Sequence, residues 1–232
     1  MTKTRVLIAD DHEIVRHGIS ALVKTLSQFE VCGEATDGRT AVQKAKELKP
    51  DIVIIDIAMP QLNGLGATRQ IMHERPSTKV LVLTMHDSEQ VVREVLEAGA
   101  RGYLLKSDAG RDLVTALDAL QHNKTFFTSK ISEMVLATFL NRRTAEPITG
   151  HLGLTSRERE VIQLVAEGKS TKEVAVALGL SVKTADTHRS NLMRKLGVHS
   201  VSELVLYAIR NNIIHVVEPL EASTTETSTV PK

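Results

Sequence analysis

Short apolar runs alternate with amphipathic stretches along the first half of the chain. Apolar runs of this length, bounded by polar residues, are typical of buried strands. We predict five strands, at about 5–9, 30–36, 51–56, 79–84 and 102–105. Apolar residues at helical spacing predict helices between and after them, near 13–26, 38–48, 65–74, 88–98 and 110–121. Such regular alternation is typical of an α/β fold with a doubly wound parallel sheet.

The pattern changes after the fifth strand–helix unit. A further helix is predicted at about 129–142, and residues 142–153 are rich in turn and linker residues. From Leu154 onward only helical patterns occur, near 155–167, 171–178, 182–196 and 200–210. The tail from Glu218 is poor in apolar residues, which is typical of disorder. We therefore expect a first domain at 1–125, a linker helix and linker at 126–153, an all-α domain at 154–216 and a disordered tail at 217–232.

Residues 171–190 of the second domain have the layout of a helix-turn-helix. Ala175 is small where two helices must cross closely, and Gly179 allows the sharp turn between them. Thr155 followed by Glu158 forms the capping-box pattern that marks the first helix of this domain. Ser181 is expected to cap the third helix in the same way, with its side chain bound to free backbone amides.

The composition is that of an ordinary soluble globular protein. The chain has 232 residues, 42% hydrophobic and 25% charged, and this length favours two domains. No apolar run approaches the ~20 residues that span a membrane, and the polar residues 1–5 are unlike a signal peptide. Cys32 is the one cysteine, which excludes an internal disulfide and fits a reducing cytosol. We expect a cytoplasmic protein without membrane contact.

Three carboxylates, a hydroxyl and an ammonium group follow separate predicted strands. They belong to Asp10, Asp11, Asp56, Thr84 and Lys106. Groups at the carboxyl ends of adjacent parallel strands converge in one crevice. Crowded carboxylates repel each other unless a divalent cation neutralises them, and oxygen ligands suit Mg²⁺. A cation, a carboxylate nucleophile and a lysine together suit phosphoryl transfer. Asp11 alone could simply cap a helix, but the combination favours a functional pocket.

The first domain resembles the receiver domain of bacterial two-component response regulators over about residues 4–122. The resemblance lies in the five residues just named, each at a strand end and in the same order along the chain. It implies a five-stranded parallel sheet with strand order 2-1-3-4-5. It also implies that Asp56 is the phosphoacceptor, which receives its phosphoryl group from a sensor histidine kinase.

The same resemblance implies roles for the neighbours of Asp56. Asp11 and Asp56 would ligate Mg²⁺ directly, together with the backbone carbonyl of Ala58, and Asp10 would act through a bound water.

Lys106 and Thr84 would contact the phosphoryl oxygens. Tyr103 matches the switch aromatic of the family, which turns inward when Thr84 moves.

The second domain resembles the LuxR-type DNA-binding domain between Leu154 and Val198. The segments that carry this resemblance are 154–161, 166–168 and 194–198. A receiver followed by this domain is similar to the NarL/FixJ class of response regulators. That resemblance implies a phosphorylation-controlled transcriptional regulator that binds double-stranded DNA and forms a homodimer when active.

On this reading the helix at 182–196 enters the major groove. Its base-facing residues would be Asp186, Thr187 and Ser190, and its phosphate-facing residues would be Lys183, Arg189, Arg194 and Lys195. Asp186 departs from the family pattern, in which lysine is common at this position. A carboxylate accepts hydrogen bonds from cytosine but repels phosphate, so the departure affects base choice.

Two other functions compete with this interpretation. A Mg²⁺ phosphohydrolase would need a second catalytic acid shortly after its nucleophile, but Ile57 and Ala58 follow Asp56, so we do not expect an enzyme. A phosphorylation-dependent adaptor that docks a protein through its helical domain stays open, and salt-dependent DNA binding would distinguish it. We also predict that the receiver covers the recognition helix until phosphorylation releases it.

Overall fold

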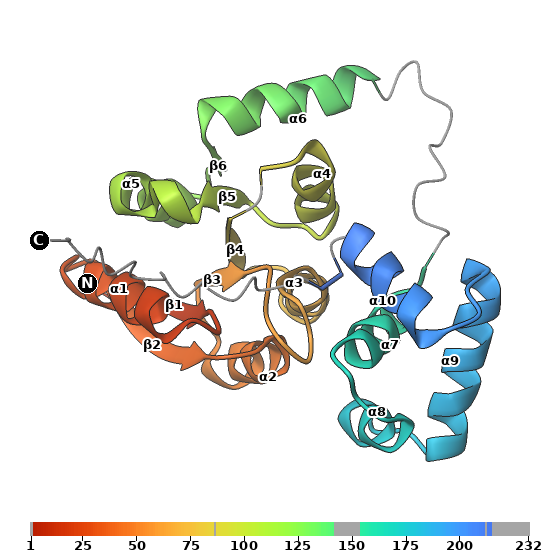
Figure 1. The fold of residues 1–232 in the computed structure, drawn as a ribbon. Coiled ribbons are helices and arrows are strands. Elements are labelled where there is room, and N and C mark those ends of the chain that lie inside the picture. Colours follow the sequence, from red (N-terminus) through yellow and green to blue (C-terminus); the bar gives the residue numbers. More distant parts are fainter. Residues whose placement is uncertain (1, 86, 142–153, 212, 215–232) are drawn as a thin grey trace, which may run out of the picture.

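The computed structural model describes residues 2–85, 87–141, 154–211 and 213–214 in two domains (Figure 1). The first domain is built on a six-stranded sheet in the order β2-β1-β3-β4-β5-β6, with every neighbouring pair parallel. Its strands are β1 (Thr4–Ala9), β2 (Phe29–Ala35), β3 (Ile52–Asp56), β4 (Lys79–Thr84), β5 (Gly102–Leu105) and β6 (Phe126–Phe127). The predicted parallel α/β sheet and the order of its first five strands are confirmed.

Helices cover both faces of the sheet, as expected of a doubly wound fold. The helices of this domain are α1 (Glu13–Lys24), α2 (Gly38–Leu48), α3 (Gly64–Glu74), α4 (Glu89–Glu97) and α5 (Ala109–Gln121). On one face, side chains of α1 and α5 such as Val23 and Leu117 pack on the central strands. On the other face, α2, α3 and α4 enclose a second apolar core that contains Ile71 and Tyr103. Burial of these faces holds the strand ends in register.

The prediction of five strands is wrong, because β6 extends the sheet beyond β5. Gly102 pairs with Phe126 and Tyr103 with Phe127. A strand of two residues has too little length for an apolar period, so the sequence pattern did not reveal it. After β6, helix α6 (Ser129–Asn141) packs against α4, and its Ile131 is fully buried in the core beside Tyr103. The start of the expected linker is thus part of the first domain's packing.

The second domain consists of four helices around a small apolar core. They are α7 (Ser156–Ala166), α8 (Thr171–Leu178), α9 (Val182–Leu196) and α10 (Val201–Arg210). Val161, Ala185 and Leu204 are each at most 1% exposed in this core. The expected residues 142–153 of the linker and 217–232 of the tail lie outside the described residues.

Polar caps fix where these helices begin. Thr155 and Glu158 form the predicted capping box of α7, and Ser170 with Glu173 forms a second one at α8. The Ser181 side chain accepts a hydrogen bond from the Thr184 amide at the start of α9, as predicted. Gly179 ends α8 in the left-handed conformation, with φ of 63°, which a glycine adopts without the steric penalty of a Cβ. The turn between α8 and α9 is therefore encoded locally.

In the part of the chain that the structure describes, no helix combines the length and the apolar character that crossing a bilayer requires.

Gly64 tests how tightly the loop after β3 is packed. A Cβ at this position would lie 1.9 Å from the carbonyl oxygen of Asp56. We expect Gly64→Ala to destabilise the protein by about 1–3 kcal/mol or more, because the obstacle is backbone and cannot rotate away. Gly110→Ala is the matched control, since nothing lies within 4 Å of its Cβ. Urea denaturation followed by circular dichroism measures both; equal midpoints would contradict the close packing.

Candidate functional site

The carboxyl ends of β1, β3 and β5 bring Asp10, Asp56 and Lys106 together. The Nζ atom of Lys106 lies 2.8 Å from Oδ2 of Asp10 and 2.9 Å from Oδ2 of Asp56. Both residues are buried: Asp10 is 1% exposed and Asp56 is 3% exposed. Three residues that are far apart in the sequence therefore form one buried ion-pair network.

Burial and the neighbouring charges both shift the pKa values of this network. Burial raises the pKa of Asp56, while the Lys106 ammonium acts to lower it. Burial acts to lower the pKa of Lys106, but the carboxylates of Asp56 and Asp10 outweigh it and raise the pKa above its usual value. Lys106 is therefore held in its charged form beside two carboxylates that would otherwise repel each other.

A cation could be held at the same place. Ligand atoms of Asp10, Asp11, His12 and Asp56 all lie within 4.8 Å of one another. Oδ2 of Asp10 and Oδ2 of Asp56 are buried and accept no hydrogen bond apart from their ion pairs with Lys106. Clustered carboxylate oxygens are the donor set that a hard cation such as Mg²⁺ prefers. The residues present thus fit the metal that the sequence predicts.

His12, which borders the predicted pocket but was assigned no role from the sequence, is a member of this cluster. Its Nδ1 lies 2.8 Å from Oδ1 of Asp11 and 3.4 Å from Oδ1 of Asp10. Its backbone amide donates to Oδ1 of Asp10 over 2.9 Å. Its place directly after the paired aspartates was the available signal. His86, the other histidine near the expected pocket, lies outside the described residues.

The remaining predicted pocket residues lie on the neighbouring strand ends. Thr84, at the end of β4, is 1% exposed, and Tyr103 on β5 is fully buried. Burial raises the pKa of the Tyr103 hydroxyl. Ala58 is half-buried in the loop between β3 and α3. Thr84 follows Leu83, which is the register partner of Asp56 on β4, so it ends the strand next to that of Asp56.

Helix α9 presents the side chains predicted to meet DNA. Exposed side chains on it are those of Lys183, Asp186, Thr187, Ser190, Arg194 and Lys195, and Arg189 is half-buried. Asp186 does not project alone: its Oδ1 lies 3.0 Å from Nη2 of Arg189. The carboxylate that departs from the family pattern therefore neutralises a neighbouring guanidinium within the helix.

Lys195 is also engaged within the domain. Its Nζ lies 2.9 Å from Oε2 of Glu158, the same residue that closes the capping box of α7. Burial acts to raise the pKa of Glu158, but hydrogen bonds from Lys195 and Thr155 lower it below its usual value. Lys195 therefore links α9 to α7, besides any part in contacting phosphate.

Comparison with known proteins agrees with this arrangement of sites. The family of response regulator receiver domains matches residues 6–118, and the luxR family of bacterial regulatory proteins matches residues 152–208. The transcriptional regulatory protein LiaR of Bacillus subtilis is 38% identical over 211 residues, covering 91% of this chain and 99% of LiaR. The oxygen regulatory protein NreC of Staphylococcus aureus is 37% identical, covering 90% and 99%. The chain belongs to the NarL/FixJ class of two-component response regulators.

Solved structures of related response regulators share this two-domain fold. RcsB of Salmonella typhimurium aligns with a TM-score of 0.60 and 30% identity, covering 89% of this chain and 97% of RcsB. RcsB of Salmonella enterica serovar Typhimurium, bound to promoter rprA in the presence of the phosphomimetic BeF₃⁻, aligns with a TM-score of 0.57 and 30% identity, covering 89% and 98%. The family is one of DNA-binding transcriptional regulators and not of enzymes, as expected.

The two domains of this response regulator meet through a buried glutamine. Gln163 on α7 is 2% exposed. Its Oε1 accepts from the amide of Asn63 over 2.8 Å, and its Nε2 donates to the carbonyl of Met59 over 2.9 Å. Both partners belong to the loop between β3 and α3, which directly follows Asp56. One side chain of the DNA-binding domain thus holds the loop that leads out of the acidic pocket.

Acidic side chains on either side of Gln163 extend this contact. Glu160 accepts hydrogen bonds from Arg39 and Gln70, each over 3.1 Å. Glu167 accepts from the backbone amide of Gln61 over 3.1 Å. Gln61 has a φ of 65°, an uncommon conformation for a residue with a Cβ, and it turns this amide toward Glu167. The loop therefore adopts a strained conformation where α7 contacts it.

The prediction that the receiver covers the recognition helix is wrong for this structure. The receiver contacts α7, whereas α9 lies on the far side of α7, away from the sheet (Figure 1). The predicted base-facing residues of α9 are exposed. Contact through α7 was not foreseeable from the sequence, because polar residues on a helix are typical of a solvated face.

Gln163 provides a test of the domain contact. We expect Gln163→Ala to destabilise the full chain by about 1–3 kcal/mol, because two buried backbone groups of the loop lose their partner. Gln43→Ala is the control: Gln43 is exposed and bonds only to Glu47 within α2. Denaturation midpoints in urea compare the two variants. A loss for Gln163→Ala no larger than that for Gln43→Ala would contradict the contact.

Proposed function

We propose that this response regulator accepts a phosphoryl group on Asp56 from a sensor histidine kinase and binds double-stranded DNA through α9. The observation that carries the proposal is the placement of Lys106 within 2.9 Å of both Asp56 and Asp10 in one buried pocket. A carboxylate nucleophile with a fixed positive charge beside it is suited to phosphoryl transfer, which depends on positioning and charge neutralisation. Family membership supports the same conclusion.

In the proposed reaction, an oxygen of Asp56 attacks the phosphorus of a phosphohistidine. The bond between phosphorus and the imidazole nitrogen breaks, and the histidine leaves with its electron pair. Lys106 moves its ammonium from the two carboxylates to the transferred oxygens, and the Thr84 hydroxyl donates to one of them. Asp10, Asp11, Asp56 and the Ala58 carbonyl would hold Mg²⁺, which supplies charge neutralisation for the transferring group.

Phosphorylation would reach the second domain through the loop between β3 and α3. Ala58, whose carbonyl would turn toward the metal, is next to Met59, whose carbonyl accepts from Gln163 on α7. A change at Ala58 therefore alters a contact one residue away. We infer that filling the pocket weakens the hold of α7 on the loop, which frees the second domain to adopt the arrangement that a dimer on DNA requires. The receiver, extended by β6 and α6 beyond residue 125, and the DNA-binding domain at about 154–216 then act as two units.

DNA binding would use the exposed face of α9. Lys183, Arg189 and Arg194 would contact phosphates, whereas Asp186, Thr187 and Ser190 would face base edges. The solved RcsB–DNA complex and the structure of two RcsB dimers on two parallel DNAs are those of a relative that binds DNA as a dimer. We propose that this chain, too, binds DNA and does so as a dimer, and that it acts in the cytoplasm.

Phosphorylation is tested with a small phosphodonor and intact-mass measurement. We expect one phosphoryl adduct on the wild-type chain in the presence of Mg²⁺, and none on Asp56→Asn, because the amide lacks the nucleophilic oxygen. Asp11→Ala should lose the Mg²⁺-dependent adduct while retaining the fold, since Asp11 is exposed. An undiminished adduct on Asp56→Asn would place the nucleophile elsewhere, and labelling independent of Mg²⁺ would contradict the metal assignment.

DNA binding should weaken steeply as salt rises, because basic side chains release counterions from the phosphates. We expect Lys183→Ala or Arg189→Ala to weaken all sequences alike and to reduce the slope of log affinity against log salt by about one. Ser190→Ala should instead change sequence preference. Lys124→Ala, an exposed lysine on the receiver, is the matched control. Absence of DNA binding by the phosphorylated chain at low salt would favour the adaptor function.

A further inference from the structure

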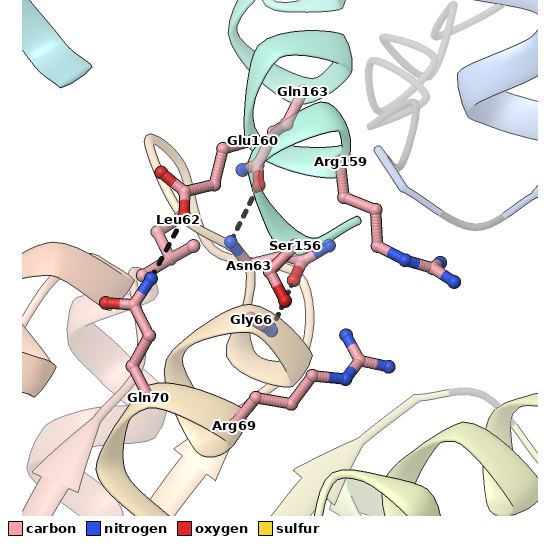
Figure 2. A pocket seen from close by; sticks show the side chains of 9 residues that line it. All are labelled: Leu62, Asn63, Gly66, Arg69, Gln70, Ser156, Arg159, Glu160 and Gln163. Carbon is pink, nitrogen blue, oxygen red and sulfur yellow. Dashed lines mark hydrogen bonds between the residues drawn. The ribbon is translucent and has the colours of Figure 1, made fainter. Parts of the chain in front are cut away.

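A pocket between the two domains contains two arginines that face each other. It is open to solvent and lies between the start of α3 and the start of α7. Arg69 comes from α3 of the receiver and Arg159 from α7 of the DNA-binding domain, and Figure 2 shows their guanidinium groups approaching across the gap. Like charges brought together across a domain contact oppose that contact.

Among the residues that the structure describes, neither Arg69 nor Arg159 forms an ion pair or a side-chain hydrogen bond. By contrast, Arg39 and Arg157 at the same contact both pair with Glu160. Burial, followed by the charge of Arg159, lowers the pKa of Arg69. The charges of Glu94 and Glu97 act in the opposite direction on the pKa of Arg69. The pocket therefore holds positive charge that is only partly compensated.

Glu160 also lines this pocket, but its carboxylate is neutralised by ion pairs with other residues. Its Oε2 lies 3.1 Å from Nη2 of Arg39 and 3.2 Å from Nη1 of Arg157, and its Oε1 accepts from Gln70. Two guanidinium groups outside the pocket thus neutralise the one carboxylate on its wall. Glu160 neither pairs with Arg69 or Arg159 nor leaves a free negative charge to repel an anion.

The start of α7 adds a further feature that favours negative charge. Ser156 is the first residue of this helix and lines the pocket with an exposed side chain. The first amides of a helix have no partner within it and carry the positive end of the helix dipole. A hydroxyl, the positive end of a helix and two guanidinium groups from opposite domains then surround one space.

We propose that this pocket binds a compact tetrahedral oxyanion, as free inorganic phosphate or as the phosphate group of a small metabolite, held between Arg69 and Arg159. The space between the two arginines is small, which favours a compact anion over a nucleotide. Guanidinium groups bind phosphate oxygens in a paired geometry. The bound anion would replace repulsion between the domains with two attractions and stabilise their contact.

The site is separate from the phosphoacceptor pocket, so its test does not depend on the proposed function. The full chain with Asp56→Asn, in EDTA, removes both the nucleophile and divalent metal. Calorimetric titration with inorganic phosphate, and separately with glycerol 3-phosphate, measures affinity and stoichiometry at constant ionic strength. We expect one site per chain, with affinity reduced about tenfold or more by Arg69→Gln or by Arg159→Gln. Tighter binding of one probe identifies the source of the phosphate group.

Matched variants separate this site from general effects of anions. Arg101→Gln alters an exposed arginine elsewhere on the receiver and should bind phosphate as the parent chain does. Arg159→Glu should place a carboxylate opposite Arg69, and the attraction between the two charges should stabilise the contact between the domains without an anion. The melting temperature of this variant should therefore be the same in phosphate as in chloride. If the Arg69, Arg159 and Arg101 variants all bind phosphate equally, or if phosphate still stabilises Arg159→Glu as it does the parent chain, the proposal is wrong.

Discussion

The ammonium group of Lys106, held between the buried carboxylates of Asp10 and Asp56, is the interaction on which the rest of the structure depends. Two buried carboxylates at one sheet edge repel each other, and each desolvated charge needs a partner. Lys106 supplies the positive charge from the end of β5, at 2.8 and 2.9 Å from the two oxygens. Lys106 thus pairs with both carboxylates, and a phosphoryl group could take over the same lysine.

The loop between β3 and α3 links this network to the second domain. It begins directly after Asp56, carries the Ala58 carbonyl, and presents the groups of Met59 and Asn63 that Gln163 contacts. Only a few residues therefore separate the nucleophile from the domain contact. Because α9 stays exposed in this arrangement, the control that we propose acts by freeing the second domain rather than by uncovering its recognition helix.

Much of this organisation could be predicted from the sequence. The boundaries of β4, α8 and α9 agree with the apolar periods, and Asp56 and Lys106 were recognisable because each ends a predicted strand. Local patterns carry such information well, since capping residues and periodic burial act over a few residues. The convergence of Lys106 and Asp10 in one pocket followed from a general property of parallel sheets, whereas their ion pair did not.

Contacts between distant segments could not be predicted in the same way. Gln163 and Asn63 are 100 residues apart, and nothing in either local pattern indicates the other. Residues Glu160, Gln163 and Glu167 share one face of α7, and a polar face on a helix is normally read as solvated. Strand β6 was missed because two residues show no period. The positive φ of Gln61 was missed because no local pattern indicates it or the contact of its amide with Glu167.

The central claim is that the state of Asp56 reaches α7 through the loop between β3 and α3. Hydrogen exchange of the backbone amides of Gln61 and Asn63 tests it most directly, because these amides donate to Glu167 and Gln163. The account predicts faster exchange at both amides when the wild-type chain is phosphorylated with Mg²⁺ present, and no change in Asp56→Asn under the same treatment. Unchanged exchange in the phosphorylated wild type, or an equal change in Asp56→Asn, would contradict it.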